Sequence, residues 1–256
     1  MKSEQTGHLT DTSEGLNGQF RRTIVIPAWD EEHRIGPILK EYLEYYGDDT
    51  EIMVVLNGCR DRTRDIAFAF LEEYKNLRLV EDTNLIGKGG ALIVGFRLAR
   101  GEIVAYVNAD GSTSPQNLDK LIKAVGDEAG VIGSRWIDKS LISVKQSLYR
   151  RMASRVFNVI VRTLFRMPYL DTQCGAKAFK REAIESIADE LGTTNYAFDV
   201  NILYLLHRKG FTITEFPITW EDRPGTKIKM RRDAPIMLGA VIRMRIKHSR
   251  FKDIVR

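Results

Sequence analysis

Four short apolar runs, each followed by a helical pattern, recur about every 25 residues through the first half of the chain. The runs are residues 22–27, 51–56, 77–81 and 103–108, and the helical patterns that follow them end at Tyr46, Tyr74, Ala99 and Val125. Strands that alternate with helices at this spacing are typical of right-handed βαβ crossovers. The sequence therefore predicts an α/β fold, in which helices cover both faces of a Rossmann-like, mostly parallel central sheet.

The loops that follow these strands carry most of the candidate site residues, namely Asp30, Glu31, Asn57, Lys88 and Asp110. The carboxyl ends of parallel strands meet at one edge of a sheet, and open α/β sheets bind their ligands at that edge. We therefore expect these five side chains to converge.

Asp110 is the first candidate for a metal ligand. The strand at 103–108 ends in Asn108-Ala109-Asp110-Gly111, which delivers a carboxylate to the carboxyl edge of the sheet. Hard divalent cations such as Mg²⁺ bind through one or two carboxylates together with substrate phosphates. The alternative is structural, because Asp-Gly also makes turns and the Asp110 carboxylate can cap the next helix.

The second half of the chain continues the α/β pattern. We predict strands at 130–133 and 211–220, a turn leading into a strand over 171–180, and helices at 145–166, 196–209 and from 233 onward. Two helix starts have local signals, since Asp61 is placed to cap the helix from Arg62, and Ser114-Pro115 marks the start of the helix that ends at Val125.

The helix predicted at 145–166 contains no acidic residue. Spaced at 100° per residue, its arginines at 151, 155, 162 and 166 form one stripe beside a broad apolar face of Leu148, Met152, Val156, Val159, Ile160 and Leu164. Arg150 and Ser154 lie one turn apart at the far border of the apolar sector, where an arginine aimed into a site would lie. A surface salt bridge is the alternative for Arg150.

Composition narrows the class of protein. The chain has 256 residues, of which 43% are hydrophobic and 29% charged, as in ordinary globular proteins. No apolar run approaches the roughly 18 residues of a membrane span. Cys59 and Cys174 lack metal-ligand spacing, so we expect free thiols and a cytoplasmic location. Residues 1–20 have no signal-peptide pattern, and we expect a disordered leader there.

The net charge of +5 is unevenly distributed, because residues 227–256 contain ten Lys/Arg and only two Asp. Such a segment suits nucleic acid, an anionic membrane surface or a phosphorylated substrate, and a solvated basic face is the alternative. Nucleic acid fits least, since aromatic residues do not interleave with the basic ones. We therefore predict a main domain over 21–230 and a basic amphipathic C-terminal helix over 231–256, which either lies in a membrane interface or packs onto the domain.

Seven short motifs occur in a family's order between Thr23 and Lys227. They are Ile26-Pro27-Ala28-Trp29-Asp30-Glu31-Glu32, Val54-Val55-Leu56-Asn57-Gly58-Cys59-Arg60-Asp61-Arg62-Thr63, Asn84-Leu85-Ile86-Gly87-Lys88-Gly89-Gly90-Ala91, Asn108-Ala109-Asp110, Ile132-Gly133-Ser134-Arg135, Asp171 to Lys180, and the charged loop from Glu221 to Lys227. In this series the chain resembles the GT-A-fold glycosyltransferases of family 2, and within them the dolichyl- or polyprenyl-phosphate mannose and glucose synthases.

The resemblance implies a role for each matching position. Donor-binding positions would be Pro27, Ala28, Trp29, Glu31, Asn57, Lys88, Asn108, Ala109, Asp110 and Lys227, with Asp110 and Asn108 holding Mg²⁺ or Mn²⁺ on the diphosphate. The acceptor phosphate would bind Arg135, Arg150 and Ser154, because guanidinium forks match phosphate oxygens. The residues acting in catalysis would be Asp110, Arg135 and Arg223, with Arg223 and Lys227 closing over the diphosphate.

The chain departs from the family's pattern at two positions. Asn108 replaces the first aspartate of the D-x-D motif, which keeps an oxygen ligand but removes a charge. Leu56-Asn57 replaces an Asp-Asp pair, which removes an acid that would read the base of the donor. An asparagine side chain both donates and accepts hydrogen bonds, whereas an aspartate only accepts.

The function implied by the resemblance is inverting transfer of a hexose from GDP-mannose or UDP-glucose to a polyprenyl phosphate, at the cytoplasmic face of a membrane. A phosphate acceptor is already ionised and needs no strong general base. The alternatives are a soluble family 2 enzyme with a hydroxyl acceptor, for which Asp199 could act as base, or a non-catalytic sugar-nucleotide binder. Asp199 could also simply begin a helix. The basic helix at 145–166 would serve a homodimer as well as a membrane.

Overall fold

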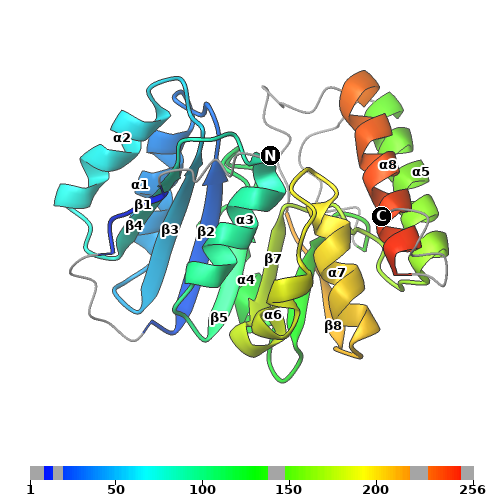
Figure 1. Ribbon diagram of the computed structural model, residues 1–256. Coiled ribbons are helices and arrows are strands. Elements are labelled where there is room, and N and C mark those ends of the chain that lie inside the picture. Colours follow the sequence, from blue (N-terminus) through cyan, green and yellow to red (C-terminus); the bar gives the residue numbers. More distant parts are fainter. Residues whose placement is uncertain (1–8, 14–19, 138–147, 220–229, 249–256) are drawn as a thin grey trace.

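The computed structural model describes residues 9–13, 20–137, 148–219 and 230–248 (Figure 1). Its centre is an eight-stranded sheet with the strand order β1-β4-β3-β2-β5-β7-β6-β8. The strands are β1 (Leu9–Asp11), β2 (Arg22–Ala28), β3 (Thr50–Asn57), β4 (Leu77–Asp82), β5 (Ile103–Val107), β6 (Gly130–Ser134), β7 (Ala176–Lys180) and β8 (Ile213–Pro217).

The central strands β4, β3, β2 and β5 run parallel to one another, and β6 runs parallel to β8. This arrangement confirms the predicted α/β fold with a mostly parallel sheet. The sequence did not indicate that β7 lies between β5 and β6 and pairs antiparallel with both. The alternation of side chains is the same for either strand direction, so the pattern alone could not reveal it.

The helices are α1 (Ile35–Tyr45), α2 (Thr63–Ala69), α3 (Gly87–Leu98), α4 (Pro115–Lys123), α5 (Leu148–Phe165), α6 (Arg181–Ile187), α7 (Phe198–Arg208) and α8 (Met230–Lys247), with 3₁₀ turns at Phe70–Glu72 and Ala188–Glu190. They cover both faces of the sheet (Figure 1). One core lies between the sheet and α1, α2 and α4, and the other lies under α3, α5, α6, α7 and α8. Strand β3 serves both, since Ile52 and Val54 enter the first core while Met53 and Val55 enter the second.

Of the two predicted helix caps, the structure confirms Ser114 and contradicts Asp61. The Ser114 side chain accepts a hydrogen bond from the Asn117 amide, so the predicted cap of α4 is confirmed. Asp61 does not occupy the N-cap of α2, because the helix begins one residue later than predicted. Its carboxylate instead accepts from the Thr63 amide (3.0 Å). The helix at Arg181–Ile187 was not predicted.

The N-terminal and C-terminal segments also differ from the predictions. Residues 9–11, within the segment expected to be a disordered leader, form β1 and pair with β4. In the C-terminal segment, the apolar face of α8 packs against the domain, with Val241 and Met244 buried in its core. Packing onto the domain therefore holds for Met237, Ala240, Val241 and Met244, whereas Ile236 of the same predicted face stays exposed. Within the described ranges no helix combines the length and apolar character that crossing a membrane requires.

Four residues of the predicted apolar face of α5 turn outward, whereas Leu164 packs against the core. Met152, Val156, Val159 and Ile160 are between 37% and 65% exposed, whereas Val161 and Phe165 on the opposite side are buried. Helices α5 and α8 lie side by side at one end of the sheet (Figure 1). Ile236 and Ile242 of α8 are also exposed. Exposed apolar side chains that gather on one face, as on α5, are typical of interaction surfaces.

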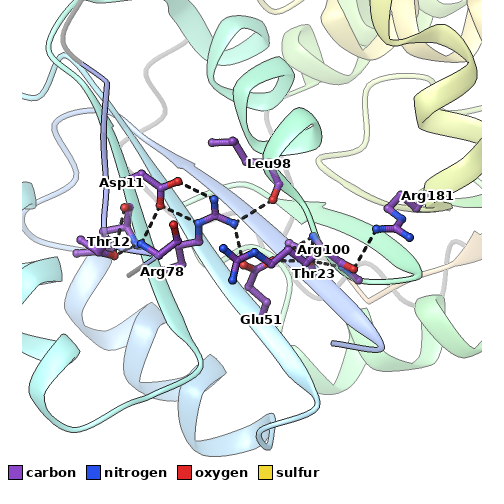
Figure 2. Close-up of polar contacts among 11 residues, drawn as sticks. Asp11, Thr12, Thr23, Glu51, Arg78, Leu98, Arg100 and Arg181 are labelled. Carbon is purple, nitrogen blue, oxygen red and sulfur yellow. Dashed lines mark hydrogen bonds and ion pairs between the residues drawn. The ribbon is translucent and has the colours of Figure 1, made fainter. Parts of the chain in front are cut away.

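A buried ionic cluster joins the end of β1 to the beginnings of β2, β3 and β4 (Figure 2). Arg78 donates to both carboxylate oxygens of Asp11 (2.8 and 2.7 Å), to Glu51 (3.1 Å) and to the Leu98 carbonyl (2.9 Å). The second Glu51 oxygen accepts from the Thr23 hydroxyl (2.7 Å). We call Asp11, Thr23, Glu51 and Arg78 the amino-edge cluster. It fastens β1, β2, β3 and β4 together at the edge remote from the predicted site.

Candidate functional site

The carboxyl ends of β2, β3, β4 and β5 meet at the opposite edge of the sheet, as the parallel order requires. The segments that leave this edge begin with Trp29, Gly58, Thr83 and Asn108. Most of the residues that the sequence assigned to donor binding therefore lie on neighbouring loops.

The loop after β2 is held by the loop after β3. Asp30 has a positive φ of 50°, and its carboxylate accepts from the Arg60 amide (2.7 Å). The Glu31 amide donates to the Thr63 hydroxyl (2.6 Å), while the Glu31 carboxylate pairs with Arg34 (2.6 Å). The segment that carries Asp30 and Glu31 is therefore fixed by its contacts with Arg60 and Thr63.

Asn57 lies at the end of β3 and is buried. Its side-chain oxygen accepts from the Ile86 amide (2.8 Å) in the loop that leads into α3. The oxygen thereby positions that loop, and the amide nitrogen is the group that an aspartate would lack.

Lys88 does not extend toward solvent from the start of α3. Its Nζ atom pairs with Asp199 (2.9 Å), at the beginning of α7. The other Asp199 oxygen accepts from Lys177 Nζ (2.6 Å) and from the Tyr106 hydroxyl, and Lys177 also donates to the Cys174 carbonyl. We call Lys88, Tyr106, Lys177 and Asp199 the carboxyl-edge cluster.

Electrostatics explain how the carboxyl-edge cluster stays ionised. Burial alone would raise the pKa of Asp199, but the charges of Lys177 and Lys88 and the hydrogen bonds from Lys177 and Tyr106 outweigh it. The pKa of this carboxyl is therefore held well below its usual range. Burial beside Asp199 also raises the pKa of Tyr106 well above its usual value. Asp199 is thus a fixed carboxylate.

The Asn108 to Asp110 segment follows β5 at the centre of this edge. The Asn108 side chain packs directly on Gly175, where a Cβ would lie 2.1 Å from its amide nitrogen, so only glycine fits opposite it. An Asp110 carboxylate oxygen accepts from the Ser112 amide (2.9 Å), which makes the local turn. Asp110 does not cap α4, since Ser114 does.

The residues present suit a metal that is shared with a ligand. The described part of the chain has no group of three or more His, Cys, Asp or Glu side chains that could hold a metal by themselves. One carboxylate at Asp110 and an amide oxygen at Asn108 match the donor set with which Mg²⁺ is bound alongside phosphates.

Arg135, just after β6, is held by a bidentate ion pair with the buried Asp171. Its Nε and Nη2 atoms donate to the two carboxylate oxygens (2.7 and 2.9 Å). Burial lowers the pKa of Arg135, but the Asp171 charge outweighs it and the pKa lies above its usual value. The amides of Leu170 and Asp171 donate to Glu215, which fixes the segment that carries Asp171.

The other predicted acceptor residues are only partly described. Ser154 is half-buried on the inward side of α5, one turn after Arg150. The side chain of Arg150, and all of Arg223 and Lys227, lie outside the described residues. Their roles stay predictions.

Lys177 and Asp171 are site-forming residues for which the sequence assigned no role. A signal for Lys177 was present, because a lysine interrupts the apolar strand Ala176-Lys177-Ala178-Phe179. A buried lysine requires a carboxylate partner. The identity of that partner, 22 residues away, was not readable from the pattern.

The site thus combines a mostly parallel sheet, the Asp110 carboxylate at its carboxyl edge and Arg135 just after β6, which fits the predicted GT-A fold. A family model, Glycosyl transferase family 2, matches residues 23–188. The chain belongs to glycosyltransferase family 2.

Curated relatives narrow the branch of the family. The chain is 32% identical over 228 residues to glycosyltransferase AglD of Haloferax volcanii, a match that covers 86% of this chain but 36% of AglD. It is 31% identical to the dolichyl-phosphate beta-glucosyltransferase of Saccharomyces cerevisiae, over 83% of this chain and 70% of the relative. The human dolichyl-phosphate beta-glucosyltransferase is 30% identical, over 80% and 69%. The chain thus spans about a third of AglD.

Solved structures agree on the fold. Glucosyl-3-phosphoglycerate synthase from Mycobacterium tuberculosis, in complex with Mn²⁺, UDP and glucosyl-3-phosphoglycerate, superposes with a TM-score of 0.67. The two chains are 18% identical, and the superposition covers 90% of this chain and 80% of the other. At this identity the likeness concerns the fold alone.

Proposed function

We propose that this protein transfers glucose, with inversion, from a nucleotide sugar to a polyprenyl phosphate. Similarity to dolichyl-phosphate beta-glucosyltransferases over most of the chain supports both the sugar and the acceptor class. UDP-glucose is therefore the preferred donor in this proposal, ahead of GDP-mannose.

The structural observation that most supports a phosphate acceptor is that Asp199 is ionised and paired with two lysines. A hydroxyl acceptor needs a base whose pKa lies near the working pH. Asp199, the candidate for that task, is buried, clamped by Lys88 and Lys177, and has a pKa far below its usual range. A phosphate acceptor arrives ionised and makes no such demand.

Divalent metal and arginine would stabilise the departing nucleoside diphosphate. In this proposal Asp110, with Asn108, holds Mg²⁺ or Mn²⁺, which supplies charge stabilisation of the leaving group. Arg223 and Lys227 would add further positive charge. Arg135, with Arg150 and Ser154, would receive the acceptor phosphate.

The exposed apolar surface of α5 and α8 supports a lipid acceptor. Met152, Val156, Val159 and Ile160 face outward beside Arg155, a pairing of apolar and cationic groups that suits an anionic membrane surface. Peripheral attachment at this surface would bring the site to the head of a lipid phosphate.

The test is donor turnover with radiolabelled UDP-glucose and GDP-mannose in separate reactions, each with Mg²⁺ or Mn²⁺ and a short polyprenyl phosphate. We expect label from UDP-glucose to enter the organic phase, and the Asp110→Ala variant to abolish it. Label transferred from GDP-mannose alone would contradict the sugar. Donor hydrolysis without labelled lipid would favour a hydroxyl acceptor, and binding without turnover would favour a non-catalytic binder.

A further inference from the structure

Three buried side-chain N–H groups lack a hydrogen-bond partner within the part of the chain that the structure describes. They are the indole Nε1 of Trp136, the amide Nδ2 of Asn158 and the amide Nε2 of Gln173. All three are donors, and no buried side-chain acceptor of the described residues is left in the same state. Because a buried donor without an acceptor is destabilising, such groups call for an explanation.

The three donors come from segments that are tied together. Trp136 follows Arg135, which is paired with Asp171. Gln173 lies two residues after Asp171, and the residue between them, Thr172, is hydrogen-bonded to Asn158 of α5. The three residues thus come from segments that meet at the end of β6, at residues 171–174 and on the inward face of α5.

The orientation of the Asn158 amide is fixed by its neighbour. Its oxygen accepts from both the backbone amide (3.2 Å) and the hydroxyl (2.6 Å) of Thr172. A backbone N–H can only donate, so the amide cannot be turned over without losing this bond. The nitrogen of Asn158, which is 3% exposed, must therefore be the atom left without an acceptor.

Two guanidinium groups flank the same place. Arg155 lies 4.9 Å from the centroid of the Trp136 ring, and Arg135 lies 5.8 Å from it. Asp171 already balances the charge of Arg135. A neutral partner or a water would satisfy the N–H groups, but it would not complement the charge of Arg155. An oxyanion with several acceptor oxygens does both.

We propose that Trp136, Asn158 and Gln173, with Arg155 and Arg135, form an oxyanion site that holds the phosphate of the acceptor. This inference rests on the proposed function and adds three donors and one arginine to its acceptor site. Arg155 also adjoins the exposed Met152, Val156 and Val159 on α5. The site therefore suits an amphiphile whose anionic head enters the domain while its chain lies along these exposed residues of α5.

The test uses Gln173→Met, which removes one N–H donor while keeping the length of the side chain. Gln116→Met, at an exposed position of α4, is the matched control. Initial rates are measured with UDP-glucose against citronellyl phosphate, a short polyprenyl phosphate. We expect the KM for citronellyl phosphate to rise about tenfold in Gln173→Met, since a bond to a charged acceptor is lost. The donor KM and the control should change less than about twofold.

Thermal unfolding separates this role from a structural one. If the N–H group serves a ligand, Gln173→Met leaves the Tm of the ligand-free protein unchanged or raises it, because a buried orphan donor disappears. Citronellyl phosphate and inorganic phosphate should each raise the Tm of the wild type more than that of the variant, and citronellol should raise neither. Trp136→Phe provides a second variant with the same expected pattern.

Failure of this inference is distinguishable from failure of the proposed function. If the wild type glucosylates citronellyl phosphate and both variants keep its KM, the oxyanion site is overturned and the function stands. A lowered Tm with unchanged acceptor KM would also overturn it, since the donors would then have a structural role. If no transfer occurs but phosphate raises the Tm of the wild type and not of the variants, the oxyanion site stands without the lipid acceptor.

Discussion

Two buried ionic clusters lie at opposite edges of the same sheet, and they are built differently. The amino-edge cluster places one cation, Arg78, between two carboxylates, and its remaining contacts are with main-chain groups (Figure 2). The carboxyl-edge cluster places one carboxylate, Asp199, between two lysines. Burial of charge is common to both, so burial alone does not mark a functional site.

The difference lies in what each cluster connects. The amino-edge cluster fastens strand starts that carry none of the predicted site residues. In the carboxyl-edge cluster, Lys88 lies in the first turn of α3, two residues after Ile86, whose amide Asn57 holds. Tyr106 is two residues before Asn108, and Lys177 holds the Cys174 carbonyl beside Gly175. The positive excess of the second cluster also suits anionic substrates. We infer that the first cluster contributes stability alone and the second contributes to both stability and activity.

The largest effect is expected for a change in the amino-edge cluster, which should lower stability and leave activity unchanged. Arg78→Met leaves Glu51 fully buried without its cation, which should lower the free energy of unfolding by about 3–5 kcal/mol. The kcat and KM of the folded enzyme should stay unchanged. Urea unfolding and initial rates below the transition measure the two quantities. Arg64→Met, which breaks an exposed pair with Glu81, is the control and should cost less than about 1 kcal/mol.

The matching change at the carboxyl edge is Asp199→Asn. It leaves Lys177 buried without a carboxylate and should cost a similar free energy of unfolding, about 3–5 kcal/mol. Here we also expect kcat/KM to fall about tenfold, because Lys88 and the 174–175 segment lose their common anchor. Asp189→Asn, at an exposed position, is the control. Unchanged kinetics in the Asp199 variant would make the two clusters equivalent and refute the distinction.

The same variant tests whether Asp199 is a base. If it were, its removal would lower kcat with a hydroxyl acceptor by 10²-fold or more and would abolish the acidic limb of the pH profile. A carboxyl whose pKa is held far below its usual range cannot set a limb near neutral pH. We expect the profiles of wild type and variant to have the same shape between pH 5 and 9.

Much of the fold could be predicted from the sequence, because β-branched strands and capped helices are local signals. Strand β3 and the Ser114 cap are examples. The outward rotation of α5 could not be predicted. Periodicity shows that Met152, Val156 and Val159 share a face, but the neighbours that cover or expose a face come from elsewhere in the chain.

The sequence indicated many residues of the candidate site, but it did not indicate which of them contact one another. The strand order brings Trp29, Asn57 and Asn108 to one edge, as a parallel sheet must. The pairing of Lys88 with Asp199 spans 111 residues, and that of Arg135 with Asp171 spans 36. Such partners are chosen by tertiary packing, so Lys88 was expected near phosphates and Asp199 was left open.

A change at Asp110 should lower activity with little effect on stability, which is the opposite of the effect expected at Arg78. Asp110→Ala removes the carboxylate expected to hold the metal, and we expect transfer to fall at least 10²-fold. Its one described side-chain contact within the loop is with the Ser112 amide, so the free energy of unfolding should change by about 1 kcal/mol or less. Asp65→Ala, at an exposed position of α2, is the control. Transfer that persists in the variant, or that is insensitive to EDTA, would contradict a metal at Asp110.

The smallest expected effect concerns Asp11, at the rim of the amino-edge cluster. Hydrogen bonds from Arg78 hold the pKa of this carboxyl below its usual value against the effect of burial. A carboxyl with a lowered pKa in the folded state adds stability that is complete above its unfolded pKa of about 3.9 and is lost as the pH falls through the folded value. At pH 7, Asp11→Asn should therefore cost about 1 kcal/mol. The gap from the wild type should close as the pH falls below about 4, where the wild-type carboxyl becomes neutral as well.

Urea unfolding of wild type and Asp11→Asn at several pH values between 2.5 and 7 measures this gap, with Asp48→Asn at an exposed position as control. A gap that stays constant with pH would mean that Asp11 acts through packing and not through its charge. In that case β1 would be held by its backbone pairing with β4. The amino-edge cluster would then reduce to the pair of Arg78 and Glu51, which is still the buried part of it.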